Sequence, residues 1–162
     1  MSVTAEHIRE SNLIEGIDDP TADAVGWAAW CWLRTQERVT PDVVLFLHRV
    51  VTAAQRDLGS GERGVWRRCQ VWVGGQSARE GADWPEVPAL MAEWCGVLAS
   101  TLRRTNDGQR TVHVGFELVH PFVDGNGRTG RLLMWWHEHK VAKPATLLRA
   151  SERHEYYRWF DA

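Results

Sequence analysis

The sequence lacks the features that would place it among secreted or membrane proteins. Its three cysteines, Cys31, Cys69 and Cys95, are an odd number with no paired Cys-x-x-Cys spacing, which favours buried or incidental thiols in a reducing compartment. No apolar run approaches the length of a membrane span, and the N-terminus lacks a signal-peptide pattern. We therefore expect a cytoplasmic protein with no membrane partner.

An excess of charge of one sign is also missing. The 19 Lys and Arg residues nearly balance the 21 Asp and Glu residues, so the formal net charge is only −2. This balance does not indicate a nucleic-acid-binding surface, and no nucleic-acid partner is expected. The sequence has no internal repeat and no low-complexity tract. Its 162 residues suffice for one domain, 1–162, with a hydrophobic core.

Helical periodicity dominates the pattern of apolar residues. Asp19-Pro20 and Thr40-Pro41 each supply an N-cap followed by proline at the first helical position. His48 lies near an apolar stripe, and we interpret it as a structural histidine. Apolar spacing predicts helices over about 3–15, 20–36, 41–57, 84–101, 110–119 and 127–140, and a final short helix capped by Ser151 that contains Tyr156, Tyr157 and Trp159. The fold class predicted is mainly α, a helical bundle.

Strand-like alternation is convincing at one place, within residues 64–75. Cys69, Val71 and Val73 alternate there with Gln70, Trp72 and Gly74. An isolated hairpin is marginally stable in water. We therefore predict a small β-hairpin that leans on the helical body.

The densest chemistry lies in residues 120–131, His-Pro-Phe-Val-Asp-Gly-Asn-Gly-Arg-Thr-Gly-Arg. Pro121 disfavours helical backbone at His120, so the preceding helix should end there and present the imidazole. Phe122 is expected to anchor the loop in the core. Asp124 offers oxygen ligands to a hard cation such as Mg²⁺, which takes one or two carboxylates together with nucleotide phosphates.

The second half of this segment predicts a phosphate cradle. Gly125 and Gly127 tolerate positive φ, which lets successive N–H groups converge on an anion. The pattern becomes helical after Gly127, so phosphates would meet a helix N-terminus. Arg128 and Arg131 lie on neighbouring helical surface and can form charge-assisted hydrogen bonds with phosphate. The alternative is an ordinary turn between two helices.

The segment resembles the signature of the Fic family of nucleotidyl transferases, His-Pro-Phe-x-Asp/Glu-Gly-Asn-Gly/Lys-Arg-x-x-Arg, with every fixed position filled. The resemblance implies the Fic fold and a protein adenylyltransferase that moves AMP from Mg·ATP to a Ser, Thr or Tyr hydroxyl of a protein. It also implies the roles of the signature residues: His120 as the base, Asp124 as the Mg²⁺ ligand, Gly125, Asn126 and Gly127 as the phosphate cradle, Arg128 as the catalytic partner of the leaving pyrophosphate, and Arg131 as the residue that orients the γ-phosphate.

Residues 1–16 contain a second resemblance. Ser11-Asn12-Leu13-Ile14-Glu15-Gly16 is similar to the inhibitory motif Ser/Thr-x-x-x-Glu-Gly/Asn of Fic proteins whose inhibitory helix is N-terminal. The family implies that Glu15 pairs with Arg131 and prevents productive seating of the γ-phosphate. Glu15 also stands where a helix dipole disfavours a carboxylate, so a cation elsewhere would compensate it. The alternative is a surface glutamate at a frayed helix end.

A third resemblance concerns the predicted hairpin. Gly64-Val65-Trp66-Arg67 is similar to the Gly-x-Tyr/Trp-Arg segment that precedes the flap of Fic proteins. The flap holds the target as an added strand, which implies docking by Arg67, Gln70, Val71, Trp72 and Val73. A hairpin that merely caps the core is the alternative. Tyr157 lies where the family places an aromatic residue near the nucleotide base, although simple packing explains it equally well.

Several readings of the function remain open at this point. Fic relatives also use UTP or CDP-choline, or transfer phosphate from inverted ATP. The last group departs from the signature near Gly127, which this sequence keeps. De-AMPylation involving Glu15 and a non-catalytic nucleotide-binding module are further alternatives. The sequence does not identify the protein target, which includes the chain itself among the candidates, or decide whether the chain forms a homo-oligomer.

Overall fold

The computed structural model describes residues 2–73, 79–102 and 108–160. Its longer helices are α1 (Ala5–Ile14), α2 (Pro20–Leu33), α3 (Pro41–Val51), α4 (Val87–Thr101), α5 (Gly108–Val119) and α6 (Asn126–Lys140). Shorter elements are the strands β1 (Trp72–Val73) and β2 (Arg79–Glu80), the helix α7 (Arg153–Tyr157) and the 3₁₀ helices η1 (Trp84–Glu86), η2 (Ala150–Glu152) and η3 (Arg158–Phe160). The mainly helical fold class is therefore confirmed.

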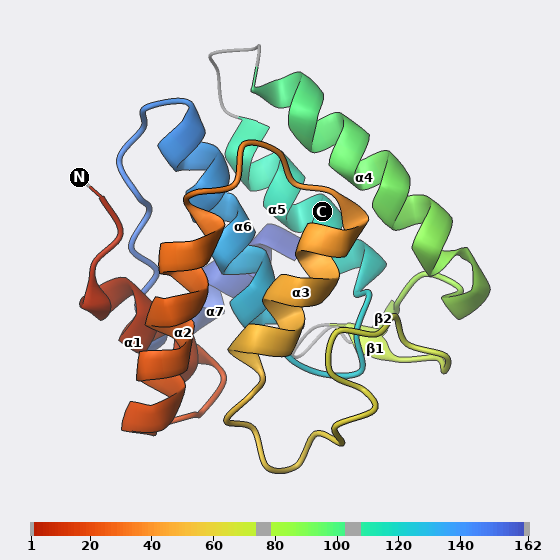
Figure 1. Ribbon diagram of the computed structural model, residues 1–162, viewed down its shortest axis with the longest axis horizontal. Helices are drawn as coiled ribbons and strands as arrows, with labels where there is room; N and C mark the ends of the chain where they lie inside the picture. The colour runs from red at the N-terminus through yellow and green to blue at the C-terminus, as the bar shows by residue number, and fades with distance from the viewer. Residues whose placement is uncertain (1, 74–78, 103–107, 161–162) are drawn as a thin grey trace.

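Helix α6 lies at the centre of the molecule and packs against α1, α2, α3 and α5 (Figure 1). Nearly all of its side chains from Asn126 to Glu138 are buried, because the helix is surrounded rather than half-exposed. The indole N–H groups of Trp135 and Trp136 donate to backbone carbonyls of Thr146 and Gln36, which satisfies their polar ends in the core. The first turn of α6 is thus held at a fixed place inside the bundle.

The predicted starts of α2 and α3 are confirmed. The Asp19 side chain accepts a hydrogen bond from the Thr21 amide, and the Thr40 hydroxyl accepts one from the Val43 amide. Pro20 and Pro41 occupy the first helical positions, as the sequence indicated.

The predicted end of the third helix near Asp57 is wrong, because α3 ends at Val51. The Thr52 hydroxyl donates to the His48 carbonyl at 2.6 Å, which competes with helical bonding at this point. Beyond it the guanidinium of Arg63 donates to several carbonyls of the following loop, namely those of Ala53, Gln55 and Leu58. Backbone groups that a longer helix would have paired are satisfied by this side chain instead.

A small antiparallel hairpin is present, but its strands differ from the prediction. Trp72 pairs with Glu80 and Val73 with Arg79, and the Gly81 amide donates to the Val71 carbonyl. The second strand therefore lies beyond the predicted range 64–75, and residues 74 and 75 of that range lie outside the described residues. Residues 64–71 are irregular, since side chains and loops take up part of their backbone bonding.

The C-terminal segment returns to α1. The Ala150 amide donates to the Glu10 carboxylate at 2.7 Å, and this hydrogen bond links η2 to α1. Ser151 is not the predicted cap, because it lies inside η2 and the residue before α7 is Glu152, which makes no side-chain cap. Within the described ranges, no helix combines the length and apolarity needed to cross a membrane.

Candidate active site

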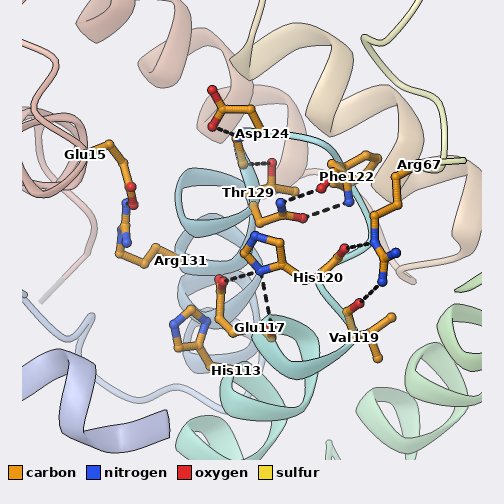
Figure 2. A network of polar contacts seen from close by, with 12 residues as sticks. Glu15, Arg67, His113, Glu117, Val119, His120, Phe122, Asp124, Thr129 and Arg131 are labelled. Atoms are coloured by element: carbon orange, nitrogen blue, oxygen red, sulfur yellow. Dashed lines mark hydrogen bonds and ion pairs between the residues drawn. The ribbon is translucent and has the colours of Figure 1, made fainter. Parts of the chain in front are cut away.

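His120 follows the last residue of α5 and has left-handed backbone, with φ of 50°. The residue before a proline avoids the right-handed helical region, so Pro121 explains why α5 ends here. The ring atom Nδ1 lies 3.2 Å from the carbonyl oxygen of Glu117 (Figure 2). Since a carbonyl only accepts, Nδ1 must carry the hydrogen, and Nε2 of the neutral ring is left as a proton acceptor. Burial lowers the pKa of His120, which favours this neutral form.

The loop after His120 is fixed by contacts of Phe122 and Asn126. Phe122 is fully buried and its ring stacks on those of His48 and Trp66, with centroid distances of 3.6 and 5.2 Å. The Asn126 side chain accepts from the Phe122 amide and donates to the Phe122 carbonyl, both at 2.9 Å. The predicted anchoring role of Phe122 is confirmed. The Asn126 side chain is committed to the loop, so only its backbone N–H is available to an anion.

His48 supports the same loop from α3. Its Nε2 donates to the Asp124 carbonyl at 2.8 Å, and its Nδ1 accepts from the Gly64 amide at 2.8 Å. Burial lowers the pKa of His48 to about 4, so the ring is neutral and both nitrogens are satisfied. The interpretation of His48 as a structural histidine is confirmed.

Gly125 and Gly127 are required for different physical reasons. Gly125 has φ of 78°, and a Cβ there would lie 2.6 Å from the Thr52 methyl group. Gly127, in contrast, is within α6 and does not have the positive φ that we predicted. A Cβ at Gly127 would overlap the Glu15 carboxylate. Gly127 is required because another part of the chain approaches it closely.

Glu15 sits at the N-terminus of α6. Its Oε1 accepts a hydrogen bond from Nη2 of Arg131 at 2.6 Å, and the Arg131 side chain is fully buried (Figure 2). Arg131 also donates to the Ser11 hydroxyl and the Ser11 carbonyl, at 2.8 and 2.9 Å. The N-cap of α6 is Gly125, which has no side chain to bond the first-turn N–H groups. The structure thus places a carboxylate where a helix N-terminus and an arginine attract an anion.

This arrangement predicts that Gly127→Ala disrupts the contact of Glu15 with α6. The added methyl group forces the carboxylate away from Arg131, and overpacking of this kind costs about 1–3 kcal/mol. In a Glu15→Gly background the clash with the carboxylate is absent and only Nη1 of Arg131 remains close, at 3.0 Å, so the loss of stability should be much smaller, because alanine also favours helix. Denaturant unfolding of the four proteins measures the difference. An equal loss of stability in both backgrounds would contradict the assigned contact.

Glu15 and His120 line a cleft of about 260 Å³. Its walls come from α5, α6, β1 and the C-terminal segment, and its lining includes Gly127, Glu117, Tyr157, Trp72 and Val73. Tyr157 therefore lies at the predicted site. Tyr156, which we did not predict as a site residue, is buried, accepts from Nη1 of Arg131 at 3.2 Å and lies 2.9 Å from Nε2 of His113. Its sequence signal was no stronger than that of any other core aromatic residue.

Asp124 and Arg128 are not among the residues that line this cleft, although Asp124 interacts electrostatically with His120, and Arg128 with Glu15 and Arg131. Arg128 is buried, and its guanidinium contacts the side chain of Gln55 and, at 3.5 Å, the carbonyl of Val51. Asp124 is exposed, accepts from the Gly125 amide at 2.6 Å and contacts Gln55 as well. Gln55 thus joins the two residues, a contact that the sequence did not indicate.

Arg67 is not an exposed docking residue, contrary to our prediction. It is 2% exposed, and its guanidinium donates to the carbonyls of His120, Cys69 and Val119, at 2.7, 2.8 and 3.2 Å, and to that of Ala82. The contacts with Val119 and His120 are at the end of α5 (Figure 2), and those with Cys69 and Ala82 are on the two sides of the hairpin. A helix C-terminus leaves carbonyls without partners, and Arg67 satisfies two of them. It therefore fixes the backbone of His120.

Loss of the Arg67 guanidinium should destabilise the protein strongly. Arg67→Met leaves buried carbonyl oxygens unpaired, and hydrogen bonds to charged groups contribute about 1.5–3 kcal/mol each, so a loss of at least about 3 kcal/mol is expected. Arg68→Met is the matched control, because Arg68 is exposed and a change there should stay within about 0.5 kcal/mol. Urea denaturation gives both values. A small effect at Arg67 would show that the hairpin is held by other contacts.

The family model described as Fic/DOC family matches residues 38–137. A curated relative, "Protein adenylyltransferase Fic" of Nematostella vectensis, is 27% identical over 99% of this chain and 36% of its own length. The chain spans about a third of the length of the curated relatives that it matches.

Two solved structures share the fold. A Fic domain containing signaling protein of Bacteroides thetaiotaomicron has a TM-score of 0.80 with 17% identity, covering 95% of this chain and 69% of that one. Fic-1 of C. elegans has a TM-score of 0.60 with 25% identity, covering 91% and 47%. The family model covers more than half of the sequence, including the signature loop, the hairpin and α3. The chain therefore belongs to the Fic/DOC family.

Proposed function

We propose that the protein is a protein adenylyltransferase, which transfers AMP from ATP to a hydroxyl side chain of a protein. The observation that carries this proposal is the state of His120: its Nδ1–H is bound to a carbonyl, and its Nε2 is a neutral acceptor beside an anion-binding helix terminus. The name of the curated relatives supports the same activity.

The triphosphate of ATP would bind at the N-terminus of α6. The uncapped N–H groups of Asn126 and Gly127 are donors that an anion can use, and Arg131 adds a positive charge. The γ-phosphate would take the place that Glu15 occupies, because both groups are anionic partners for Arg131. Tyr157, which also lines the cleft, is available to the nucleotide base.

Mg²⁺ is expected with the nucleotide, and the residues present fit this ion. Among the described residues, no group of three His, Cys, Asp or Glu side chains could hold a metal on its own. Mg²⁺ bound with a nucleotide does not need such a group, because it is held by one or two carboxylates plus phosphates. The exposed carboxylate of Asp124 is the residue that would hold it. The ion would supply positive charge to the phosphates.

The chemical step follows from the position of His120. Nε2 accepts the proton of the target hydroxyl while the hydroxyl oxygen attacks the α-phosphorus of ATP. The bond between the α-phosphorus and the bridging oxygen breaks, and pyrophosphate leaves with the electron pair. Glu117 holds the imidazole in place through its backbone carbonyl, and Arg67 holds the backbone of His120. Placement and electrostatics, rather than a covalent enzyme intermediate, account for this reaction. Arg128, which interacts electrostatically with Glu15 and Arg131, would contribute its charge to the pyrophosphate.

We propose further that Glu15 inhibits this activity. Its carboxylate is bonded to Arg131, and the last turn of α1 is held there by Ser11. A triphosphate cannot share this position, since the two anions would compete for the same donors. Release of Glu15 is therefore needed before ATP can bind productively.

The hairpin is the proposed docking element for the target. Trp72 is 65% exposed and lies at the rim of the cleft, whereas Val73 is buried against the body. A target segment that pairs with this short hairpin would bring its hydroxyl to His120 through backbone hydrogen bonds. The exposed Gln70 and the half-buried Val71 remain candidate contacts.

The donor nucleotide is tested directly by mass. Glu15→Gly protein is incubated with a cell lysate and with ATP, UTP, GTP or CDP-choline, each with Mg²⁺, and modified proteins are analysed by mass spectrometry. ATP should give an increment of about 329 Da on Ser, Thr or Tyr. An increment that appears only with another donor would replace the adenylyltransferase proposal by a different transferase.

A further inference from the structure

Glu117 is a buried acid in the wall of the cleft that the mechanism above does not use through its side chain. It lies on α5, one turn before His120, and is 5% exposed. Its Oε2 is 3.9 Å from Nδ1 of His120 (Figure 2). Its Oε1 is buried and has no hydrogen-bond partner. An unpartnered buried oxygen is costly, so a bound water or ligand that supplies a hydrogen-bond partner would stabilise this carboxyl.

The fold makes room for this carboxyl. A Cβ at Gly130 of α6 would overlap Oε1 of Glu117, so the helix omits a side chain at the point where the acid lies. The buried carboxyl is thus matched by a residue without a side chain on the facing helix. The space at Gly130, in the second turn of α6, accommodates Oε1, and Glu117 lines the cleft together with Gly127 of the first turn.

The groups around Glu117 are already engaged with one another. Arg131 is bonded to Ser11, Glu15 and Tyr156, and His120 Nδ1 is bonded to the backbone of Glu117. The titratable or charged groups that face it are Glu15 from the end of α1, His113 and His120 from α5, Arg131 from α6, and Tyr156 and Tyr157 from α7.

The charge state of Glu117 follows from these surroundings. Burial raises its pKa to about 8, Arg131 opposes this rise, and Glu15 adds to it. The side chain is therefore a neutral carboxylic acid at neutral pH. Such an acid is a hydrogen-bond donor, and a buried carboxyl kept neutral can serve as one in an active site.

We propose that Glu117 is a ligand-binding residue of the cleft that, in its neutral form, donates a hydrogen bond to an anionic oxygen of the bound nucleotide. This inference rests on the proposed function, since it assumes a phosphate group in the cleft. The ionised form has no proton to donate and repels the same oxygen. Glu117 thus gives the cleft a donor without adding a second permanent cation beside Arg131.

The proposal predicts a pH dependence of nucleotide affinity. The neutral form binds, so affinity should be full below the pKa of Glu117 and fall by up to tenfold per pH unit above it. The experiment uses the Glu15→Gly protein, in which Arg131 is free, and measures the Kd for Mg·ATP by calorimetry between about pH 6 and pH 9. Because Glu15 raises the pKa of Glu117, the midpoint should lie below that of the intact chain.

Two variants in the Glu15→Gly background make the test specific. Glu117→Gln keeps an N–H donor and cannot ionise, so the loss of affinity at high pH should disappear. Glu117→Leu removes the donor, and its Kd should be about tenfold weaker at the acidic end with no further loss at high pH. A Glu117→Gln protein that keeps the pH dependence of its parent would overturn the proposal. So would a Glu117→Leu protein that binds as tightly as its parent at low pH.

The same samples separate this proposal from the proposed function. Thermal unfolding of each variant establishes that it is folded, and AMP transfer is assayed on the Glu15→Gly parent. A parent that binds Mg·ATP with the expected pH profile but transfers no AMP would overturn the transferase proposal and leave the role of Glu117 standing. A parent that transfers AMP but binds Mg·ATP independently of pH would overturn the role of Glu117 and leave the transferase proposal standing.

Discussion

Glu15→Gly should raise AMP transfer by about 10- to 100-fold. The carboxylate occupies the position of the γ-phosphate and makes a charge-assisted hydrogen bond with a fully buried arginine. Such a bond contributes about 1.5–3 kcal/mol, which corresponds to this range of competing affinity. Incorporation of label from α-³²P-ATP into the protein itself and into lysate proteins, at matched Mg·ATP, measures the change.

Two further variants separate the causes of this activation. Glu15→Gln keeps the size of the side chain but removes its charge, and should give an intermediate increase. Glu6→Gln is the matched control, because Glu6 is a solvent-exposed acid on the same helix that pairs with Arg149. Equal labelling by the wild type and Glu15→Gly would remove the inhibition proposal.

His120→Ala in the Glu15→Gly background should reduce AMP transfer by about 10²- to 10⁴-fold, the usual contribution of general base catalysis. The Kd for Mg·ATP should stay close to that of the parent, because the imidazole is a proton acceptor in this account and not a phosphate ligand. Single-turnover transfer and calorimetry measure the two quantities separately.

The left-handed backbone at residue 120 requires a second variant. Alanine is strained at φ of 50°, whereas asparagine tolerates this region and has no basic nitrogen. His120→Asn should therefore be as inactive as His120→Ala and more stable. Transfer that survives in both variants would place the base elsewhere, and a parallel loss of ATP binding would make the imidazole a phosphate ligand.

The signature loop could be predicted from the sequence because its chemistry is local. The end of α5 at His120 follows from Pro121, and the burial of Phe122 follows from its large apolar ring, which anchors the loop in the core. The contact of Glu15 with Arg131 spans most of the chain, yet it was expected, because a motif resemblance supplied the partner.

Other residues of the site could not be found in this way, since their roles depend on long-range contacts. Arg67 is part of a motif that precedes the hairpin, but only the fold shows that its guanidinium faces the carbonyl of His120. Gln55 was expected in a helix and instead joins Asp124 to Arg128 from a loop. Gly127 was explained by positive φ, whereas the approach of Glu15 is the reason that the structure provides. None of these contacts has a sequence pattern.

The burial and the charge state of Glu117 also could not be predicted from the sequence. In the sequence it is one acid in an otherwise amphipathic helix, and helical spacing from Val112 and Phe116 does not reveal that it is buried. Its environment is set by Gly130 on another helix and by Arg131 and Glu15. A buried acid of this kind is recognised only in the folded structure, because the sequence does not show that Gly130 and Arg131 lie next to Glu117.

The central claim, that His120 and the start of α6 act on the α-phosphate of ATP, is tested most directly by following both ends of the nucleotide. Glu15→Gly protein is supplied with ATP labelled at the α- or the γ-position, and the labelled product is identified. The account predicts α-label on protein and γ-label in pyrophosphate, with both products lost in the Glu15→Gly, His120→Asn double variant. Protein that carries the γ-label, or α-label that persists without His120, would contradict it.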